Sequence, residues 1–398
     1  METKNYTSIR LEVTSGCNLK CEYCHNSEYS NRKDDMTTKE ILDLISNAKK
    51  HYNINKILLT GGEPLLNKDI IDIVSFITDL GIKADMVTNA TLLDEKMARR
   101  LEKAGLKRVR ISIDTLNDER SQRTGSMTAT LWKKAEWIAK NTGIEVCIHT
   151  VCSPSNVDQM FEVYKKVYEI GAARWRVFDI GYQGRALTNN QLGFEKYYEK
   201  LISASKRIIN HYLVNGYEDK LDIEINNIFR TILLKAEPRN LDVNEMLKIR
   251  LKSSPCDYVA DHQISVRSDG TATLCQYFHE TILDFRKYEF DVSATIHNVH
   301  NTPEYNLIME ELPYCSKCKY CMVCNSGCRA RAKFLTGDIT EADPGACYIC
   351  KKVVEEIIPI LPKNTQESYM ECVNQKGLEP KYNIDDLKKM LTSKGLIK

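Results

Sequence analysis

The chain has 398 residues, 28% of them charged, and its formal net charge is +2 at pH 7. So small a charge does not favour a nucleic-acid or membrane surface as a partner. The N-terminus lacks the apolar core of a secretory signal, and no uninterrupted apolar run is long enough to span a bilayer. We therefore expect a cytoplasmic protein of two or three domains. In that reducing compartment its 15 cysteines indicate metal ligands rather than disulfides.

The first 180 or so residues alternate short apolar or β-branched runs with amphipathic segments of helix length. The runs fall at residues 8–13, 57–60, 84–88, 109–113, 145–150 and 174–178. This βαβα order predicts a parallel sheet, and six such units suit an α/β fold, an open (βα)6 partial TIM barrel. Ligands of such folds bind where the strands reach their C-terminal ends, so residues there are candidates for function.

Local signals predict the ends of the helices between these strands. Thr37 and Glu40 form a capping-box pattern before the first helix. A glycine precedes each of four later strands, where a left-handed helix cap is expected. These are Gly81, Gly105, Gly143 and Gly171.

Three cysteines, Cys17, Cys21 and Cys24, follow the first strand with gaps of three and two residues. From a short loop, their sulfurs can turn onto one metal centre. Structural zinc and closed iron-sulfur clusters take four protein ligands, so three thiolates indicate a 4Fe-4S cluster with one iron left for a ligand that is not protein. Three buried core cysteines are the alternative. The spacing closely resembles the signature of the radical S-adenosylmethionine (radical SAM) superfamily, which implies that this cluster binds SAM.

Further strand ends are expected to open toward the same face as this loop. After the second strand, the paired glycines Gly61 and Gly62 let backbone approach a ligand, and the carboxylate of Glu63 can accept hydrogen bonds from an ammonium group. An ordinary turn is the alternative. The resemblance to radical SAM enzymes implies that this motif binds the amino group of the SAM methionine. Asn89 and Ser112 resemble the ribose-contacting positions of the family, and Asp114 is a further expected SAM contact. From its charge, Arg123 could contact the methionine carboxylate. A substrate contact or a solvated side chain is the alternative for this arginine.

The pattern changes after the sixth strand, where a loop leads into long charged helical stretches. We expect a partial barrel at residues 1–186, a helical bridge at 187–250, a cysteine-rich domain at 251–350 and a helical tail at 351–398. In the loop, Gly184, Arg185 and Ala186 resemble a tripeptide of relatives that carry extra clusters. An arginine that faces water is the alternative.

A second concentration of cysteines occupies the C-terminal third. Seven of them, Cys256, Cys275, Cys315, Cys318, Cys324, Cys328 and Cys347, resemble the SPASM pattern in order and spacing. That resemblance implies a small α+β domain with two auxiliary 4Fe-4S clusters. Between the first two, an Asp269-Gly270 turn predicts a hairpin that brings Cys275 back toward Cys256. A zinc ribbon is the competing interpretation, because two-residue cysteine spacings serve zinc equally well.

The SPASM resemblance also implies how these cysteines divide. The outer cluster receives Cys315, Cys318, Cys324 and Cys347, and the inner cluster receives Cys256, Cys275 and Cys328. The inner cluster lacks an evident fourth ligand, for which Cys321, Cys350, Asp261, His262 or a substrate atom are open alternatives. Of the other cysteines, Cys147 and Cys152 are expected to be structural, and Cys372 has no indicated role.

Together these motifs predict a radical SAM oxidoreductase that cleaves SAM to methionine and a 5′-deoxyadenosyl radical, which abstracts hydrogen from unactivated carbon. The auxiliary clusters would take up the electron left on the substrate, or bind the substrate directly. A donor such as flavodoxin or ferredoxin would reduce the first cluster. No acid or base is indicated.

The sequence constrains the substrate less than it constrains the reaction. SPASM relatives most often modify peptides, so crosslinking, oxidation or epimerisation of a peptide is the first expectation. Gln276 and Tyr277 stand where the sulfatase-maturing branch has an aspartate, which weakens that branch. The cysteine motif begins close to Met1, leaving no room for an N-terminal peptide-recognition domain. Oxidation of a small molecule, such as a sugar or a tetrapyrrole, is the alternative, and a non-catalytic iron-sulfur or zinc scaffold is the third interpretation.

Overall fold

A curved parallel sheet forms the body of the protein. The computed structural model describes residues 8–123, 127–181, 183–188, 194–217, 220–225, 228–230, 263–278, 280–292, 302–310, 312–324, 326–374 and 377–397. Within these ranges no helix is both long enough and apolar enough to cross a bilayer.

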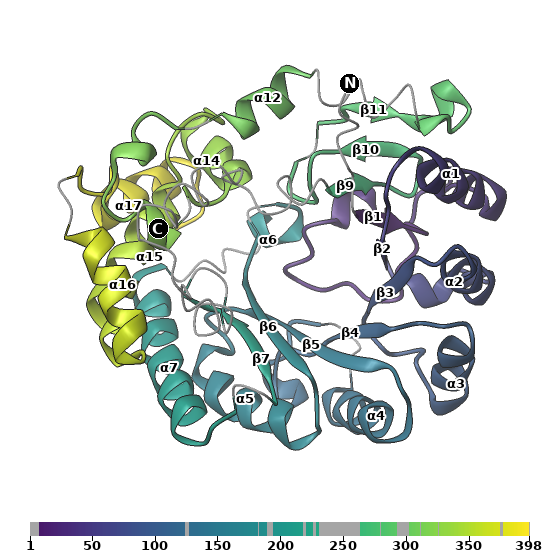
Figure 1. Ribbon diagram of the computed structural model, residues 1–398, viewed down its shortest axis with the longest axis horizontal. Coiled ribbons are helices and arrows are strands. Elements are labelled where there is room, and N and C mark those ends of the chain that lie inside the picture. Colours follow the sequence, from purple (N-terminus) through teal and green to yellow (C-terminus); the bar gives the residue numbers. More distant parts are fainter. Residues whose placement is uncertain are drawn as a thin grey trace.

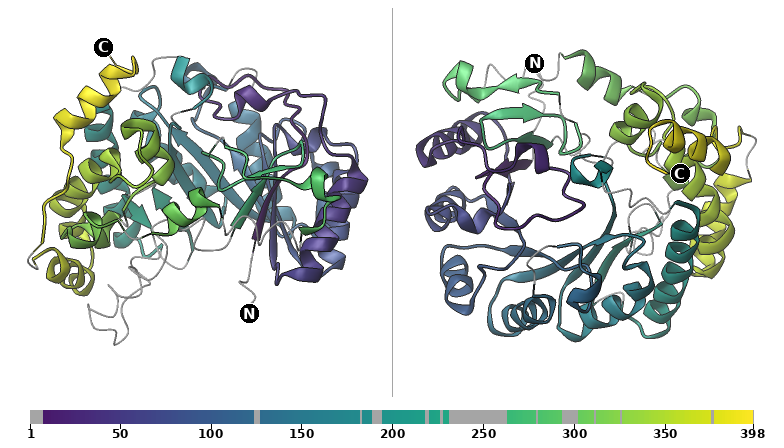
Figure 2. Two further views of the ribbon diagram at one scale, coloured as in Figure 1. Left: turned by 90° about the horizontal axis from the view of Figure 1, so that it is seen from above. Right: turned by 180° about the vertical axis from the view of Figure 1, so that it is seen from behind.

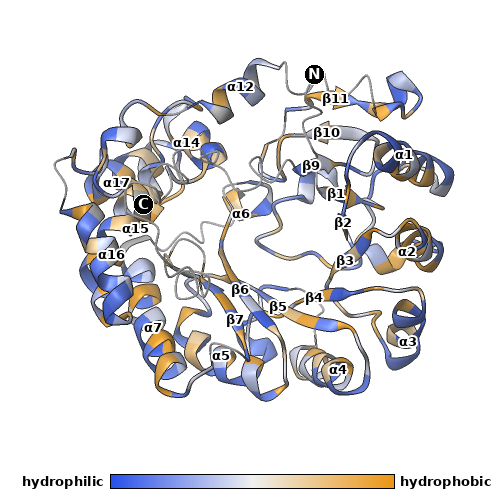
Figure 3. Cartoon of the chain, in the orientation of Figure 1, coloured by the Kyte–Doolittle hydropathy of each residue, from blue (hydrophilic) through white to orange (hydrophobic). Residues whose placement is uncertain are grey.

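The six predicted strands are all present, and each pairs in parallel with the next (Figure 1). They are β1 (Ser8–Glu12), β2 (Lys56–Thr60), β3 (Lys83–Thr88), β4 (Arg108–Ser112), β5 (Glu145–Cys152) and β6 (Arg174–Asp179). Alternate residues point to opposite faces of a strand. One set, exemplified by Ile111 and Ile148, is fully buried in the main core. The other set lies on the concave inner face and is largely polar, so both kinds alternate along the strands (Figure 3).

Five helices cover the outer face of this sheet (Figure 1). They are α1 (Thr38–His51), α2 (Ile70–Asp79), α3 (Glu95–Lys103), α4 (Thr128–Asn141) and α5 (Met160–Glu169). The capping box of Thr37 and Glu40 is confirmed. Gly81, Gly105 and Gly171 take the expected left-handed conformation, with φ of 70°, 93° and 76°.

The predicted cap at Gly143 is wrong. Thr142 ends α4 in an extended conformation. Its backbone N–H and its hydroxyl both donate to the carbonyl of Ile138, at 3.1 and 2.8 Å. Because these two bonds already satisfy the end of the helix, no left-handed glycine is needed there.

The sheet continues beyond the six predicted strands on both sides and reaches 11 strands among the described residues. After the long helix α7 (Phe194–Val214), strand β7 (Asp222–Ile225) pairs in parallel with β6, and β8 (Phe229–Arg230) follows it. The segment expected as a helical bridge therefore also holds strands. Its strand β7 has only four residues, two of them charged, which is too short for a clear periodicity.

On the other side, a segment of the expected cysteine-rich domain joins the barrel. Strand β9 (Gln263–Val266) pairs in parallel with β1, and β10 (Thr271–Thr273) and β11 (Leu283–Asp284) follow as antiparallel strands. The predicted hairpin turn is present: Gly270 has a φ of 83°, and the N–H of Arg267 donates to the carbonyl of Thr271 at 2.7 Å. The expected approach of Cys275 to Cys256 involves a residue outside the described ones.

The remaining described helices lie toward the opposite end of the molecule from α1 and α2, most of them beside α7, with α12 (Pro303–Met309) between them and β11 (Figure 1, Figure 2). The others are α13 (Cys321–Cys324), α14 (Arg329–Thr336), α15 (Pro344–Lys352), α16 (Lys363–Val373) and α17 (Ile384–Ser393). The tail packs over the cysteine-rich region, because α17 contacts α14 and α15 and buries Leu387 and Leu391 completely. The short α6 (Arg185–Thr188) lies within the curve of the barrel (Figure 1).

Candidate active site

The first cysteine loop follows β1 at the C-terminal end of the sheet. Cys17, Cys21 and Cys24 are all half-buried and reduced. The pKa of the Cys21 thiol is raised to about 11, mainly by burial. Arg123 opposes this rise, whereas Asp114, Cys24 and Cys17 add to it, so the three thiols are near enough to interact. Thiolates in such a place require a compensating positive charge. Three neighbouring thiols in one short loop therefore fit an iron-sulfur cluster better than they fit three free thiols.

The paired glycines after β2 pack directly on this loop. The N–H of Gly62 donates to the carbonyl of Thr14 at 2.9 Å, and the N–H of Glu63 donates to that of Gly16 at 2.7 Å. A Cβ atom on Gly62 would lie 2.1 Å from the carbonyl oxygen of Gly16, and one on Gly61 equally close to that of Thr14. Glycine is thus required at both positions for contact between two segments of the protein. The sequence analysis had explained the two glycines by the approach of a ligand and missed this reason.

Glu63 joins the ends of β2 and β3. Its side chain is fully buried and accepts hydrogen bonds from the hydroxyl of Thr88 and the N–H of Asn89, both at 2.7 Å, and from the N–H of Leu65 at 3.1 Å. Burial raises the pKa of this carboxyl, and the three hydrogen bonds oppose that rise. The side-chain amide of Asn89 donates to Asn18 in the cysteine loop at 2.9 Å. The residues predicted to bind SAM at these two strand ends are therefore adjacent.

Asp114 and Arg123 meet at Tyr23, which lies inside the cysteine loop. Tyr23 donates a short hydrogen bond to Asp114, and Arg123 donates to the Tyr23 hydroxyl at 3.1 Å and lies 3.8 Å from the Asp114 carboxylate. Burial opposes the charge of Arg123, but Tyr23 and Asp114 raise its pKa above the ordinary value. The solvated alternative for Arg123 is wrong, since only 8% of its surface is exposed. The trio anchors the cysteine loop to β4.

Ser112 is half-buried on the inner face at the end of β4, directly across from His149 of β5. It lies two residues before Asp114, so its side chain points toward the same end of the barrel. The predicted SAM-contact residues thus gather at one edge of the sheet, around the cysteine loop.

Arg185 also belongs to this site. The sequence analysis had left open the alternative that its side chain faces water. Its guanidinium donates to the carbonyl of Cys21 at 2.8 Å, and its backbone N–H donates to the carbonyl of Cys24 at 3.2 Å. Gly184 has a φ of 57°, and a Cβ there would lie 2.4 Å from the Cys24 carbonyl oxygen. The motif therefore contacts the later part of the cysteine loop, whereas Gly62 contacts residues 15 and 16 just before it.

We expect Arg185→Met to weaken the cysteine loop. The change removes a charged hydrogen bond worth about 1.5–3 kcal/mol and a positive charge that favours the Cys24 thiolate. Iron bound by this loop should be lost faster under oxygen, and its reduction potential should become more negative, as measured by redox titration with electron paramagnetic resonance. Arg120→Met, at an exposed arginine, is the control; equal changes in both variants would contradict the assigned contact.

Six cysteines gather in the C-terminal layer. Electrostatic contacts link the four expected outer ligands to one another and to the two spare cysteines. The six are Cys315, Cys318, Cys321, Cys324, Cys347 and Cys350. Over the described residues, no three His, Cys, Asp or Glu side chains are spaced to hold a metal ion. A 4Fe-4S cube is larger than an ion and separates its ligands further.

Only some of the expected inner-cluster ligands lie within the described residues. Cys256, together with the alternatives Asp261 and His262, lies outside the described residues. Cys275 is 7% exposed, and the N–H of Cys328 donates to Asp343 at 2.7 Å. The side chain of Cys372 likewise lies outside the described part, whereas Cys147 and Cys152 are fully buried, as expected.

Arg331 connects the cysteine-rich region to the barrel, a link that the sequence did not indicate. Its guanidinium donates to both oxygens of Asp343, at 2.8 and 2.9 Å, and lies 3.7 Å from the carboxylate of Asp179 at the end of β6. Asp343 also accepts a hydrogen bond from the backbone N–H of Cys328. These linked polar contacts position the second cysteine region against the C-terminal edge of the barrel.

Fold and site together define a partial-barrel enzyme with a three-cysteine loop at the C-terminal edge of its sheet. Residues 11–167 match the family model of the Radical SAM superfamily. Residues 11–167 therefore form a radical SAM domain, and the protein is a radical SAM enzyme. This domain implies SAM and a 4Fe-4S cluster as cofactors.

Two curated relatives match over most of their length. The AdoMet-dependent heme synthase of Methanosarcina barkeri is 26% identical over 359 residues, which cover 85% of this chain and 96% of the relative. The Fe-coproporphyrin III synthase of the same organism is 25% identical, covering 86% and 88%. Among solved structures, native anSMEcpe with bound AdoMet and Cp18Cys peptide superposes with a TM-score of 0.68 at 19% identity, covering 90% of this chain and 99% of that one. At that identity the likeness shows the fold alone.

Proposed function

We propose that this radical SAM enzyme oxidises a small molecule of the tetrapyrrole class. The observation that carries the proposal is the match over nearly the full length of two relatives whose names specify heme and Fe-coproporphyrin III. Peptide modification was the first expectation from the sequence, and it is now the second candidate. Its support is the structural likeness to anSMEcpe, whose structure holds a peptide.

We assign the first cluster to Cys17, Cys21 and Cys24, and the SAM methionine to the motif Gly61, Gly62 and Glu63. When bound there, SAM and the cluster supply a radical that abstracts hydrogen from carbon. Because Glu63 is fully buried and Asn89 is tied to the cysteine loop, these groups are positioned before SAM arrives. Asn89 and Ser112 would contact the ribose. Asp114 and Arg123 would act mainly by holding the loop.

We assign two auxiliary 4Fe-4S clusters to the C-terminal cysteines. The outer one has Cys315, Cys318, Cys324 and Cys347 as ligands, and the inner one has Cys256, Cys275 and Cys328. They would take up the electron left on the substrate. The chain Cys328, Asp343, Arg331 and Asp179 supports this route, because it joins the inner-cluster region to the barrel edge.

The test is SAM cleavage by the anaerobically reconstituted and reduced protein. We expect 5′-deoxyadenosine to form slowly with SAM alone and faster with iron-coproporphyrin III, whose modification is followed by mass spectrometry. Stimulation by a set of cysteine- or aromatic-rich peptides and not by the porphyrin would favour the peptide candidate. Stimulation by neither, with clusters intact, would overturn the proposed substrate class.

Two neighbouring cysteines on α15 test the outer-cluster assignment. Cys350 donates through its thiol to the carbonyl of Cys347 at 3.2 Å and forms a hydrogen bond that raises the pKa of Cys324. We expect Cys347→Ser to lower the iron content by about four atoms per chain, the content of one cluster, and Cys350→Ser to leave it unchanged. The reverse pattern in anaerobic iron analysis would make Cys350 the ligand.

A further inference from the structure

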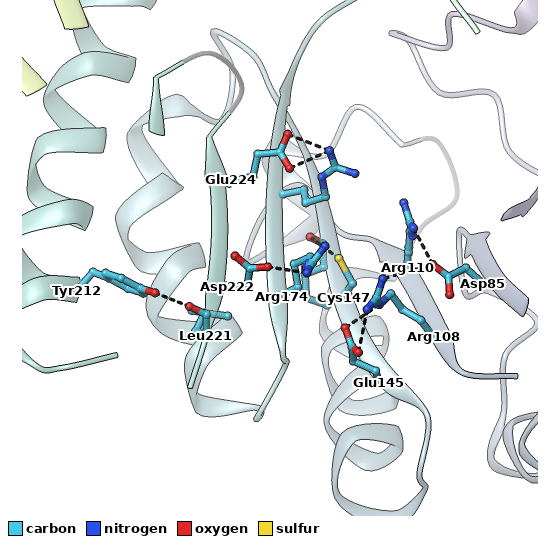
Figure 4. Close-up of polar contacts among 12 residues, drawn as sticks. Asp85, Arg108, Arg110, Glu145, Cys147, Arg174, Tyr212, Leu221, Asp222 and Glu224 are labelled. Atoms are coloured by element: carbon cyan, nitrogen blue, oxygen red, sulfur yellow. Dashed lines mark hydrogen bonds and ion pairs between the residues drawn. The ribbon is translucent and has the colours of Figure 1, made fainter. Parts of the chain in front are cut away.

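The inner face of the barrel carries charged side chains where apolar branched ones usually fill such barrels. Four arginines on β4 and β6 form ion pairs across neighbouring strands (Figure 4). The pairs are Arg108 with Glu145 at 2.6 Å, Arg110 with Asp85 at 2.7 Å, Arg174 with Asp222 at 2.6 Å and Arg176 with Glu224 at 2.8 Å. Only the Arg110–Asp85 pair is buried, and the other three pairs are half-exposed. A half-exposed ion pair stabilises a fold by only about 0–1 kcal/mol, and apolar residues in place of a buried pair are often neutral or stabilising. Fold stability alone therefore does not account for this face.

One row of this face connects the expected SAM site to an arginine. The strand registers place Ser112 of β4 beside His149 of β5, His149 beside Arg176 of β6, and Arg176 beside Glu224 of β7. These four side chains are only half-buried. Their outward-pointing neighbours Ile148 and Val177 are buried in the core. The row therefore faces the accessible interior of the barrel.

His149 has an unusual electrostatic surrounding. Its Nε2 atom is buried and has no hydrogen-bond partner. Burial first, and then the charges of Arg110, Arg176, Arg174 and Arg108, hold its pKa well below the ordinary value. The imidazole is thus neutral and lies in a positive field. Arg110, 8% exposed, also leaves its Nε atom without a partner, so both side chains keep an unused polar atom.

We propose that His149, Arg110 and Arg176 bind a carboxylate group of the substrate, beside the place where SAM would lie against Ser112. An anion would occupy the positive field, accept charge-assisted hydrogen bonds from the guanidinium groups, and favour protonation of the imidazole, which then becomes a further donor. The inference rests on the proposed function and adds how the substrate is recognised: the protein binds a carboxylate group that the substrate itself carries.

The experiment measures anaerobic binding by absorbance titration of the full-length holoenzyme. Iron-coproporphyrin III, which carries carboxylates, is compared with its methyl ester, which does not. We expect the acid to bind and the ester to bind at least about tenfold more weakly. Arg176→Gln and His149→Gln should each weaken binding of the acid about 10- to 100-fold, as the loss of one hydrogen bond to a charged group predicts, with partial recovery in Arg176→Lys.

Arg108→Gln is the matched control. It removes the same charge from the same face, four residues along β4 from Ser112 and bonded to Glu145. Because Arg108 contributes least of the four arginines to lowering the His149 pKa, this variant should bind the acid within about twofold of the unchanged protein. The double change Arg176→Gln with Glu224→Gln removes the pair together, so that no unpaired carboxylate disturbs folding. Binding that is unchanged in the Arg176 and His149 variants, or equally weak in Arg108→Gln, overturns the inference and leaves the proposed function standing. Binding of neither acid nor ester by the unchanged protein overturns both.

Discussion

Replacement of Cys17, Cys21 and Cys24 together by alanine is expected to reduce 5′-deoxyadenosine formation to background. The three thiols lie together at the C-terminal edge of the sheet, and no other described cysteine lies in that loop. Iron should fall by about four atoms per chain, the content of one cluster, while the C-terminal cysteines keep theirs. Chromatographic detection of 5′-deoxyadenosine and anaerobic iron analysis measure the two effects.

The control is Cys152→Ala, which removes a fully buried thiol from the core and should retain SAM cleavage. If the triple variant cleaved SAM at the rate of the unchanged protein, the first cluster would have to lie elsewhere.

The second large effect is expected at Gly62. A methyl group there would lie 2.1 Å from the carbonyl oxygen of Gly16 and 2.6 Å from that of Ser15, and backbone cannot move aside as a flexible side chain can. Gly62→Ala should therefore separate β2 from the cysteine loop and break the hydrogen bonds of residues 62 and 63 to that loop. We expect a loss of about 3 kcal/mol in the free energy of unfolding, measured by denaturant unfolding, and greatly weakened SAM binding.

Gly143→Ala separates this effect from the general consequence of adding a methyl group. Its Cβ would meet only the Glu102 carboxylate, at 3.5 Å, and its φ is not left-handed. This change should be neutral or should stabilise by up to about 1 kcal/mol, through the lower entropy of the unfolded chain. Equal losses in the two variants would contradict the packing role assigned to Gly62.

Periodicity predicted the six barrel strands because each carries a clear apolar set that the outer helices bury. It failed for β7 and for the pairing of β9 with β1. The first is short and half charged, and the second joins segments some 250 residues apart, which no local pattern reports. The wrong prediction at Gly143 has a similar cause. The hydroxyl of Thr142 bonds the last turn of the helix, so no left-handed glycine is needed there.

For the site, cysteine spacing predicted which residues gather but not what holds them. The cysteine loop is fixed by backbone contacts of Gly62, Glu63 and Arg185, and these depend on the three-dimensional course of the chain. Arg123 was left undecided because its partner Tyr23 is 100 residues away. The charged inner face was missed because arginines that alternate with apolar residues resemble an ordinary solvated strand face.

The pairing of β9 with β1 has a consequence for the order of folding. Strand β1 leads into the first cysteine loop, and among the described residues one of its edges pairs with β9, residues 263–266. During synthesis that edge stays open until most of the chain has been made, and an open parallel edge can recruit other strands. Fragments that end before β9 should therefore aggregate, and the first cysteine loop should reach its final rigidity only after the C-terminal region has docked.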